Sequence, residues 1–263
     1  DISAVGGSIT AFSGTGTSYT ATFTPTDNSN ADGVISVSSD KYNDAAGNEN
    51  NEASNTITLS VDTVEPTISI ASDVSELKAG EKATLTITLS EASTTFTADD
   101  ISATGGSITD FSGSGTSYTA TFTPTDNSNA DGVISVSSPK FVDAAGNNNE
   151  VSNTVTLSVD TVEPTISIVS DVTELKVGQA ATLTITLSEP STDFTADDIS
   201  ATGGSITAFS GEGTSYTATF TPTDNSNADG VISVDSSRFT DAAGNANNVA
   251  SDKVTISVDT VEP

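Results

Sequence analysis

Short runs in which apolar residues alternate with serine or threonine recur along the whole chain. Such alternation predicts β-strands with one buried and one solvent-facing side, which is typical of antiparallel sheets. Glycine-containing turn sequences separate the runs, and no stretch shows helical periodicity. The pattern therefore predicts an all-β protein. In the middle of the chain the runs lie at residues 67–70, 84–89, 118–122, 133–136 and 154–159.

The chain is built from tandem repeats. The sequence TSYTATFTPTDNSNADGVISV occurs three times without a change, first at residues 17–37. The linker DTVEP also occurs three times, at 62–66, 160–164 and 259–263, so the period is 98 residues (160 − 62) and then 99 (259 − 160). A period near 100 residues is too long for a solenoid repeat and fits independently folding modules.

The linkers divide the chain into segments of unequal length. Residues 62–159 and 160–258 are complete repeats, and 259–263 begins a further linker. Residues 1–61 form a truncated repeat that lacks its first two strands, because Asp1-Ile2-Ser3 matches residues 100–102. About seven short strands in ~100 residues predict an immunoglobulin-like β-sandwich, and modules in series predict an elongated rod. We expect the truncated repeat to be partly exposed, or completed by strands from another chain.

The order of the strands predicts which loops share a pole of the module. In the second repeat, strand 84–90 returns to the linker end, the next strand starts there at 99–101, and strand 133–141 climbs back to it. The predicted inner faces consist of Ile68, Ile70, Leu85, Ile87, Leu89, Ile101, Phe111, Tyr118, Phe122, Ile134, Val136, Phe141, Val155, Leu157 and Val159.

The composition excludes several classes of function. The 36 acidic and 7 basic residues leave a formal charge of -29, which repels nucleic-acid phosphates and anionic lipids and argues against partners of either kind. No apolar run approaches the ~20 residues of a membrane helix. The chain has no His, Cys, Met or Trp, which excludes most zinc sites, activated nucleophiles and disulfides. We therefore do not expect an enzyme.

The acidic loops are predicted to converge at the linker pole of each complete repeat. Two unscreened carboxylates 4 Å apart repel by about 1 kcal/mol even in water. A calcium ion with about 6–8 oxygen ligands would offset this repulsion and tolerates irregular loops, so we predict Ca²⁺ here. Any one of these residues also fits an ordinary solvated turn. The candidate ligands are Asp62, Glu65, Glu91, Asp99, Asp100 and Asp143, and in the third repeat Asp160, Glu163, Glu189, Asp197, Asp198 and Asp241.

The opposite pole carries a second acidic loop, which offers weaker candidates: Asp126, Asp131, Asp224 and Asp229. Their spacing is not that of an EF-hand, and no Glu follows at the bidentate position. A polar turn and an ion site are equally good interpretations of this loop. An ion bound here would face the linker that follows the last strand and would brace the junction.

Four features together resemble the bacterial immunoglobulin-like repeats that form extender arrays in giant surface adhesins exported by type I secretion, of the repeats-in-toxin type. They are the linker DTVEP, a Ser-Glu that ends the second strand, an Asp-Ile that opens the third, and DAAGN before the last strand. The resemblance covers all three repeats. It implies an extracellular, calcium-rigidified spacer on the bacterial cell surface that projects a distal adhesion region for attachment or biofilm formation.

The resemblance also implies a ligand set, in which neighbouring repeats are the partners of each linker. The matching positions are Asp62, Glu91, Asp100 and Asp143, then Asp160, Glu189, Asp198 and Asp241, with only Asp1 and Asp44 in the truncated repeat. The family's usual linker has Ala where Glu65 and Glu163 stand. Without calcium the junctions would repel and swing, and with calcium they would lock.

A competing interpretation is that the repeats themselves bind a glycan, ice or another surface. Rows of outward threonines, for example Thr84, Thr86 and Thr88, would serve that purpose. Threonine at alternate positions is also what a solvated sheet face uses. The near-identity of the repeats favours a protein selected for length over one selected for diverse recognition.

Overall fold

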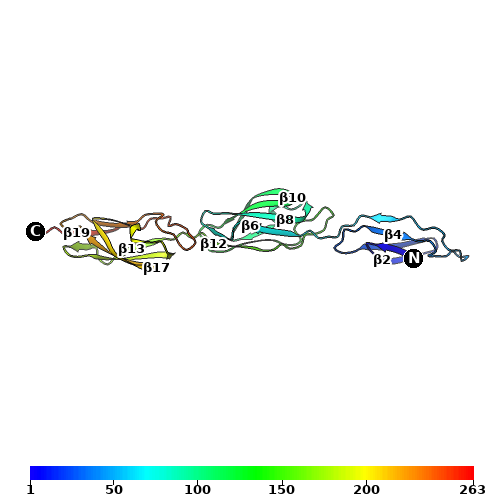
Figure 1. Cartoon of the computed structure of the whole chain (residues 1–263), viewed down its shortest axis with the longest axis horizontal. Coiled ribbons are helices and arrows are strands. Elements are labelled where there is room, and N and C mark those ends of the chain that lie inside the picture. Colours follow the sequence, from blue (N-terminus) through cyan, green and yellow to red (C-terminus); the bar gives the residue numbers. More distant parts are fainter.

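The computed structural model describes residues 1–263 and consists of three β-rich units arranged in line as a rod (Figure 1). We call residues 1–61 unit 1, residues 62–159 unit 2 and residues 160–258 unit 3. The chain contains strands and two one-turn 3-10 helices but no α-helix, which confirms the predicted all-β, tandem immunoglobulin-like architecture. No helix is long and apolar enough to cross a membrane.

Unit 2 is a sandwich of two sheets. A three-stranded sheet has the order β10-β8-β6, and a four-stranded sheet has the order β7-β12-β11-β9. All neighbours are antiparallel except β7 and β12, which run parallel. The strands are β6 (Ile68–Ser72), β7 (Glu76–Lys78), β8 (Ala83–Ser93), β9 (Ile101–Thr104), β10 (Gly106–Pro124), β11 (Gly132–Val136) and β12 (Val155–Asp160).

Unit 3 repeats this topology, with sheets β13-β15-β17 and β14-β19-β18-β16. The parallel pair is here β14 with β19. The strands are β13 (Ile166–Ser170), β14 (Glu174–Lys176), β15 (Ala181–Ser191), β16 (Ile199–Thr202), β17 (Gly204–Pro222), β18 (Gly230–Val234) and β19 (Val254–Asp259).

Each complete unit has its own hydrophobic core between the two sheets. Along β8 buried and exposed residues alternate strictly from Ala83 to Ser90, as the sequence pattern predicts. Phe122 is fully buried, and its ring lies against two glycines. A Cβ at Gly106 or Gly132 would approach Phe122 Cζ to 2.5 or 2.6 Å, so only glycine leaves room for the ring there.

The core differs from the prediction at six side chains, two of which are the small buried residues Ala83 and Ala120 that the prediction left out. Phe111 and Val155 are only partly buried, whereas Leu77 and Phe96 are buried and were not predicted. Leu77 belongs to β7, a strand too short to show alternation. The predicted strand 133–141 is also too long, because β11 ends at Val136 and Phe141 reaches the core from the loop that follows.

The predicted start of the third strand at Asp99 is wrong. Residues Ala98–Asp100 form the 3-10 helix η1, and β9 begins only at Ile101. Thr97 and Asp100 make a reciprocal capping box around this turn, which explains why the chain does not enter the sheet earlier. In unit 3, the 3-10 helix η2 (Ala196–Asp198) has the same capping box.

Unit 1 has strands β1 (Ile2–Val5), β2 (Gly7–Thr15), β3 (Ser18–Pro25), β4 (Gly33–Val37) and β5 (Ile57–Leu59). They form the sheet β1-β4-β5 and the hairpin β2-β3, without counterparts of β6 and β8. None of its hydrophobic side chains is buried: Tyr19 is 55% exposed, whereas the equivalent Tyr118 is 4% exposed. The inner face of unit 1 is therefore open, as expected for a repeat without its first two strands.

Candidate metal centre

The linker pole of each complete unit brings three carboxylates together. In unit 2 one oxygen each of Asp62, Glu91 and Asp143 lies within 4.8 Å of the others, and in unit 3 the same holds for Asp160, Glu189 and Asp241. We call each set a carboxylate cluster. Its members come from the linker, from the end of β8 or β15, and from the loop before the last strand of the unit. These are three of the segments that the strand order predicted to meet.

The loop aspartate of each cluster is fixed by hydrogen bonds from its own turn. Asp143 Oδ1 accepts from the backbone N–H groups of Ala145, Gly146 and Asn147 at 2.7–2.9 Å, and Oδ2 accepts from Asn147 Nδ2 at 2.8 Å. Burial alone would raise the pKa of Asp143, but these hydrogen bonds, led by Asn147, outweigh it and lower the pKa. The turn therefore holds an ionised carboxylate whose position does not depend on a cation.

The strand glutamate of each cluster has the opposite environment. Glu91 receives no hydrogen bond, and its pKa is raised by burial first, then by the charges of Asp62 and Asp143. The pKa of Glu189 is likewise raised by burial first, then by the charges of Asp160 and Asp241, and also by a side-chain hydrogen bond with Asp241. The glutamates thus carry the uncompensated repulsion of the cluster, which a bound cation would remove.

The linker aspartate is tied to the following unit through its backbone. Asn245 Nδ2 donates to the carbonyl oxygen of Asp160 at 3.0 Å and to Asp241 Oδ2 at 2.8 Å. Asn147 makes the equivalent bond to Asp62 at 3.2 Å. These asparagines orient both the linker and the loop carboxylate, and the prediction from the sequence missed them. The Asn that closes both DAAGN motifs is the signal that points to them.

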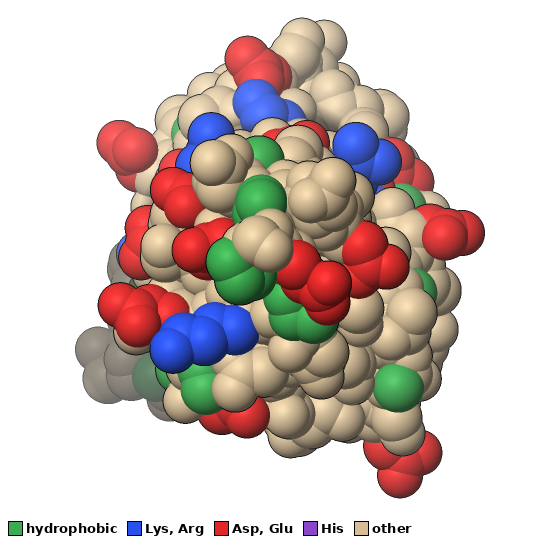
Figure 2. Space-filling model, turned by 90° about the vertical axis from the view of Figure 1, so that its left-hand side faces the viewer, with side chains coloured by type: hydrophobic (Ala, Val, Ile, Leu, Met, Phe, Trp, Pro, Cys, Tyr) green, Lys and Arg blue, Asp and Glu red, His purple; other side chains and the backbone are tan.

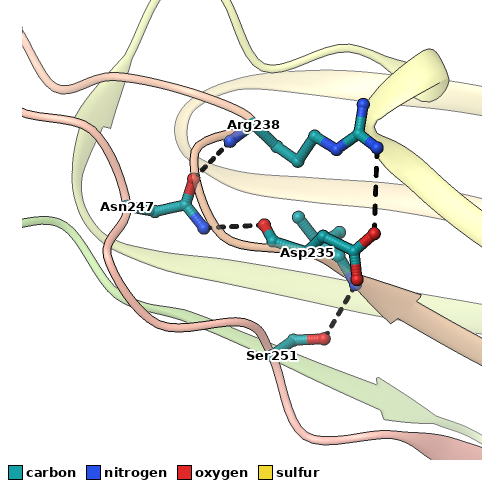
Figure 3. A network of polar contacts seen from close by, with 5 residues as sticks. Asp235, Arg238, Asn247 and Ser251 are labelled. Carbon is teal, nitrogen blue, oxygen red and sulfur yellow. Dashed lines mark hydrogen bonds and ion pairs between the residues drawn. The ribbon is translucent and has the colours of Figure 1, made fainter.

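The loop that carries Asp241 is itself anchored to the body of unit 3. Asn247, which is fully buried, accepts from the N–H of Arg238 at 2.7 Å and donates to the carbonyl of Asp235 at 2.9 Å (Figure 3). Nearby, the N–H of Val234 donates to Ser251 Oγ at 2.9 Å, and an ion pair of 3.7 Å joins Arg238 to Asp235. Hydrogen bonds of a buried side chain therefore hold the loop that carries Asp241 against the body of unit 3.

The remaining predicted ligands at this pole lie outside the clusters. Glu65, Glu163, Asp99 and Asp197 are exposed. Asp100 Oδ2 accepts from the N–H and hydroxyl of Thr97 at 2.8 and 3.1 Å, and Asp198 accepts equivalently from Thr195. Ligation by these residues stays a prediction.

Unit 1 assembles no carboxylate cluster. Asp44 sits in a turn like that of Asp143, where Asn48 provides the largest of the hydrogen-bond contributions that lower its pKa. Asp1 is exposed, and unit 1 has no second-strand glutamate to complete a set.

At the opposite pole a threonine of the linker makes the contacts that the sequence suggested for an ion. Thr161 Oγ1 donates to the carbonyl of Thr125 at 2.7 Å and accepts from the N–H of Ser128 at 3.0 Å. The loop thus faces the following linker, and a hydroxyl braces the junction. The acidic side chains Asp126, Asp131, Asp224 and Asp229 are exposed and belong to no carboxylate cluster, so their role as ligands stays a prediction.

The donor chemistry of the clusters suits a hard cation. Carboxylate oxygens are the ligands that calcium and magnesium prefer, and the chain has no His or Cys that would favour a transition metal. At the C-terminal end of the rod, acidic side chains ring the pole, with a few basic and hydrophobic side chains between them (Figure 2). Part of the acidic charge of the chain therefore lies on the surface at which unit 3 ends.

The fold and these poles define a tandem array of immunoglobulin-like modules with acidic junctions. The family of bacterial Ig-like domains matches residues 1–61, 62–159 and 160–258, so the chain belongs to this family. No curated protein matches the chain in sequence.

Several solved structures are distantly similar. The chain is 18% identical to FdeC, an Escherichia coli adhesin, with a TM-score of 0.40 over 98% of this chain and 85% of that one. The Yersinia pseudotuberculosis adhesin InvE is 13% identical with a TM-score of 0.27, and InvD of the same organism is 18% identical with 0.29. In both cases the match covers 74% of this chain and 58% of the other.

Proposed function

We propose that this chain is a calcium-rigidified spacer of a bacterial cell-surface adhesin, which projects a distal adhesion region from the cell. The observation that carries the proposal is the meeting of three carboxylates at each linker, one of them a glutamate whose repulsion is left uncompensated. Membership of the bacterial Ig-like family and the resemblance to extender repeats support the extracellular, non-enzymatic role, with type I secretion as the export route.

The mechanism follows from the elements that supply the ligands. Asp160 belongs to the linker, whereas Glu189 and Asp241 belong to unit 3, so an ion bound to all three would join the linker to the unit after it. Thr161 already joins the linker to unit 2. Calcium would thus complete the connection from unit to unit. Extracellular calcium modules bind at ~10⁻⁴–10⁻³ M, which suits a rod that becomes stiff only outside the cell.

The competing function, in which the modules bind a glycan or ice, has one structural observation in its favour. The exposed threonines of β8 face threonines of β10 in register, with Thr86 opposite the exposed Thr119 and Thr84 opposite the half-buried Thr121. A solvated sheet has the same appearance. A glycan array and an ice-recrystallisation assay on the whole chain separate the two functions, since a spacer gives no signal in either.

Calcium titration followed by thermal melting and solution scattering tests the spacer proposal. We expect millimolar Ca²⁺ to raise the Tm and to lengthen the maximum dimension, and EDTA to reverse both changes. The variant Asp160→Asn should lose most of the response of unit 3 and keep that of unit 2, whereas Glu163→Gln, in the same linker but outside the cluster, should keep both. A Tm and a maximum dimension that are the same in calcium and in EDTA would overturn the proposal.

A further inference from the structure

Units 2 and 3 touch directly, beside the linker that connects them. The backbone N–H of Ala79, in the turn after β7, donates to Asn245 Oδ1 at 2.7 Å. Lys78 Nζ lies 3.4 Å from the carbonyl oxygen of Gly244 in the same loop. Both acceptors belong to the loop that carries Asp241, so the turn of one unit contacts the cation-facing loop of the next.

Burial shows that this contact covers both partners. Lys78 and Ala79 are half-buried, whereas the equivalent Lys176 and Val177 of unit 3 are exposed. Asn245 is 3% exposed, whereas the equivalent Asn147 at the junction of units 1 and 2 is only partly buried. Unit 1 has no counterpart of β7 and its turn, and Asn147 Oδ1 accepts no hydrogen bond. The DAAGN loop of unit 3 thus contacts a turn of the preceding unit, whereas the DAAGN loop of unit 2 has no such turn to contact.

The turn presents its N–H because of its own geometry. Glu81 donates its N–H to the carbonyl of Lys78 at 3.1 Å, and Gly80 has φ +79, which together define a type II turn with Ala79 at its second position. The N–H at that position takes no part in the turn, so it points outward and is free for an acceptor. In unit 3 the turn at Val177 and Gly178 is built in the same way, with φ +75 at the glycine.

We infer that the turn after β7 is a docking surface for the DAAGN loop of the next module, and that Asn245 is the positioning residue that sets the orientation of unit 3 on unit 2 without an ion. Asn245 uses its amide oxygen for Ala79 of one unit and its amide nitrogen for Asp160 and Asp241. We call the bond from Ala79 to Asn245 the latch. The exposed turn at Val177 fits a further module of the same family.

The latch is independent of the proposed calcium site but adjacent to it. The ion would join the linker to unit 3, and Thr161 joins the linker to unit 2, whereas the latch joins the two units to each other. Without calcium the carboxylates of the cluster repel one another, but this repulsion does not act on the latch, which still joins the two units. The orientation of units 2 and 3 should therefore persist in EDTA, although unit 3 itself is less stable there.

The test removes one N–H from the turn and leaves all side chains of the cluster in place. Proline suits the second position of a type II turn, so Ala79→Pro keeps the turn and deletes the donor. Val177→Pro makes the same change in the equivalent turn of unit 3 and is the matched control. The chain has no cysteine, so Thr86→Cys and Thr184→Cys on exposed positions of β8 and β15 accept spin labels specifically.

Electron–electron distance distributions between the two labels are measured on the full chain in EDTA and in calcium. In EDTA we expect a single narrow distance for the parent and for Val177→Pro, and its loss into a broad distribution for Ala79→Pro. If Ala79→Pro keeps the parent's narrow distribution in EDTA, or if the parent is already broad there, the latch is refuted.

A second pair of variants tests whether the loss of bonds within the loop is by itself enough to change the measured distance. Asn245→Ala should broaden the distance between units 2 and 3, and Asn147→Ala, which removes the same bonds within its own loop, should leave that distance unchanged. Equal broadening by both variants would refute the latch. The calcium arm keeps the two proposals apart, because a parent that does not respond to calcium contradicts the spacer proposal while the result for Ala79→Pro in EDTA still decides the latch.

Discussion

Neutralising the strand glutamate of unit 3 should have opposite effects with and without calcium. Glu189→Gln keeps the size of the side chain and removes one of the three charges that lie within 4.8 Å of one another. In EDTA this relieves repulsion and stabilises unit 3. In calcium the same change removes a charged ligand and destabilises unit 3 relative to the parent.

The magnitude follows from the geometry of the cluster. Two unit charges 4.8 Å apart interact by ~0.9 kcal/mol at the dielectric constant of water, and Glu189 faces two such charges. Salt screening and residual repulsion in the unfolded chain reduce the sum, so we expect a gain of about 1–1.5 kcal/mol in EDTA. For a module of ~100 residues this raises the Tm by roughly 5–10 °C. Calcium at 100 times its Kd stabilises the parent by about 2.7 kcal/mol, and Glu189→Gln should lose most of that gain.

Circular dichroism melts at low ionic strength, in EDTA and in millimolar calcium, measure both effects. Units 2 and 3 can unfold in separate transitions, so Glu91→Gln, the same change in unit 2, assigns each transition to its unit. Glu163→Gln removes a linker charge outside the cluster and is the control for net charge. If Glu189→Gln and Glu163→Gln shift the Tm in EDTA by the same amount, or if the effect of Glu189→Gln has the same sign in calcium, the cluster does not act as described.

Two further outcomes are expected. In EDTA, acidification from pH 7 toward 5 should raise the Tm of units 2 and 3. The pKa of Glu91 and of Glu189 is raised above the ordinary 4.5, so the folded state binds protons more tightly than the unfolded state. The destabilising contribution of the two ionised glutamates therefore fades as the pH falls through the raised pKa toward 4.5. A Tm that falls over that range would contradict this sign. Thr161→Val leaves the N–H of Ser128 without its acceptor and should cost about 1–3 kcal/mol, seen as faster hydrogen exchange of the Ser128 amide, whereas Thr63→Val should affect only the equivalent Ser29.

The strands and the convergence of the clusters could be predicted from the sequence because both depend on simple geometry. Alternation identifies β8 and its buried face from Ala83 to Leu89, and a strand that leaves one pole must end at the other. The ends of the linker, of β8 and of the loop with Asp143 therefore had to meet. Position along the chain was enough to place Asp62, Glu91 and Asp143 at one pole.

What the sequence did not reveal depends on single hydrogen bonds. Asp99-Asp100-Ile101 reads as the start of a strand, but Thr97 and Asp100 form a capping box that closes a helical turn over Ala98–Asp100. The strand β7 has three residues and one buried side chain, Leu77, too little for any periodicity. The contact of Ala79 with Asn245 joins residues 166 positions apart, and no local pattern predicts such a pair.

The parallel pairing of β7 with β12 bears on how a complete unit responds to a pulling force along the rod. A pull along the rod enters unit 2 at its first strand and leaves where β12 ends at Asp160. Leu77 lies opposite Val159 in this pair, and the N–H of Ser158 reaches across to the carbonyl of Ser75 at 2.9 Å. These bonds lie across the line of force, so they are sheared together and cannot be opened one after another. We therefore expect such a unit to stretch little until all bonds of the pair break together.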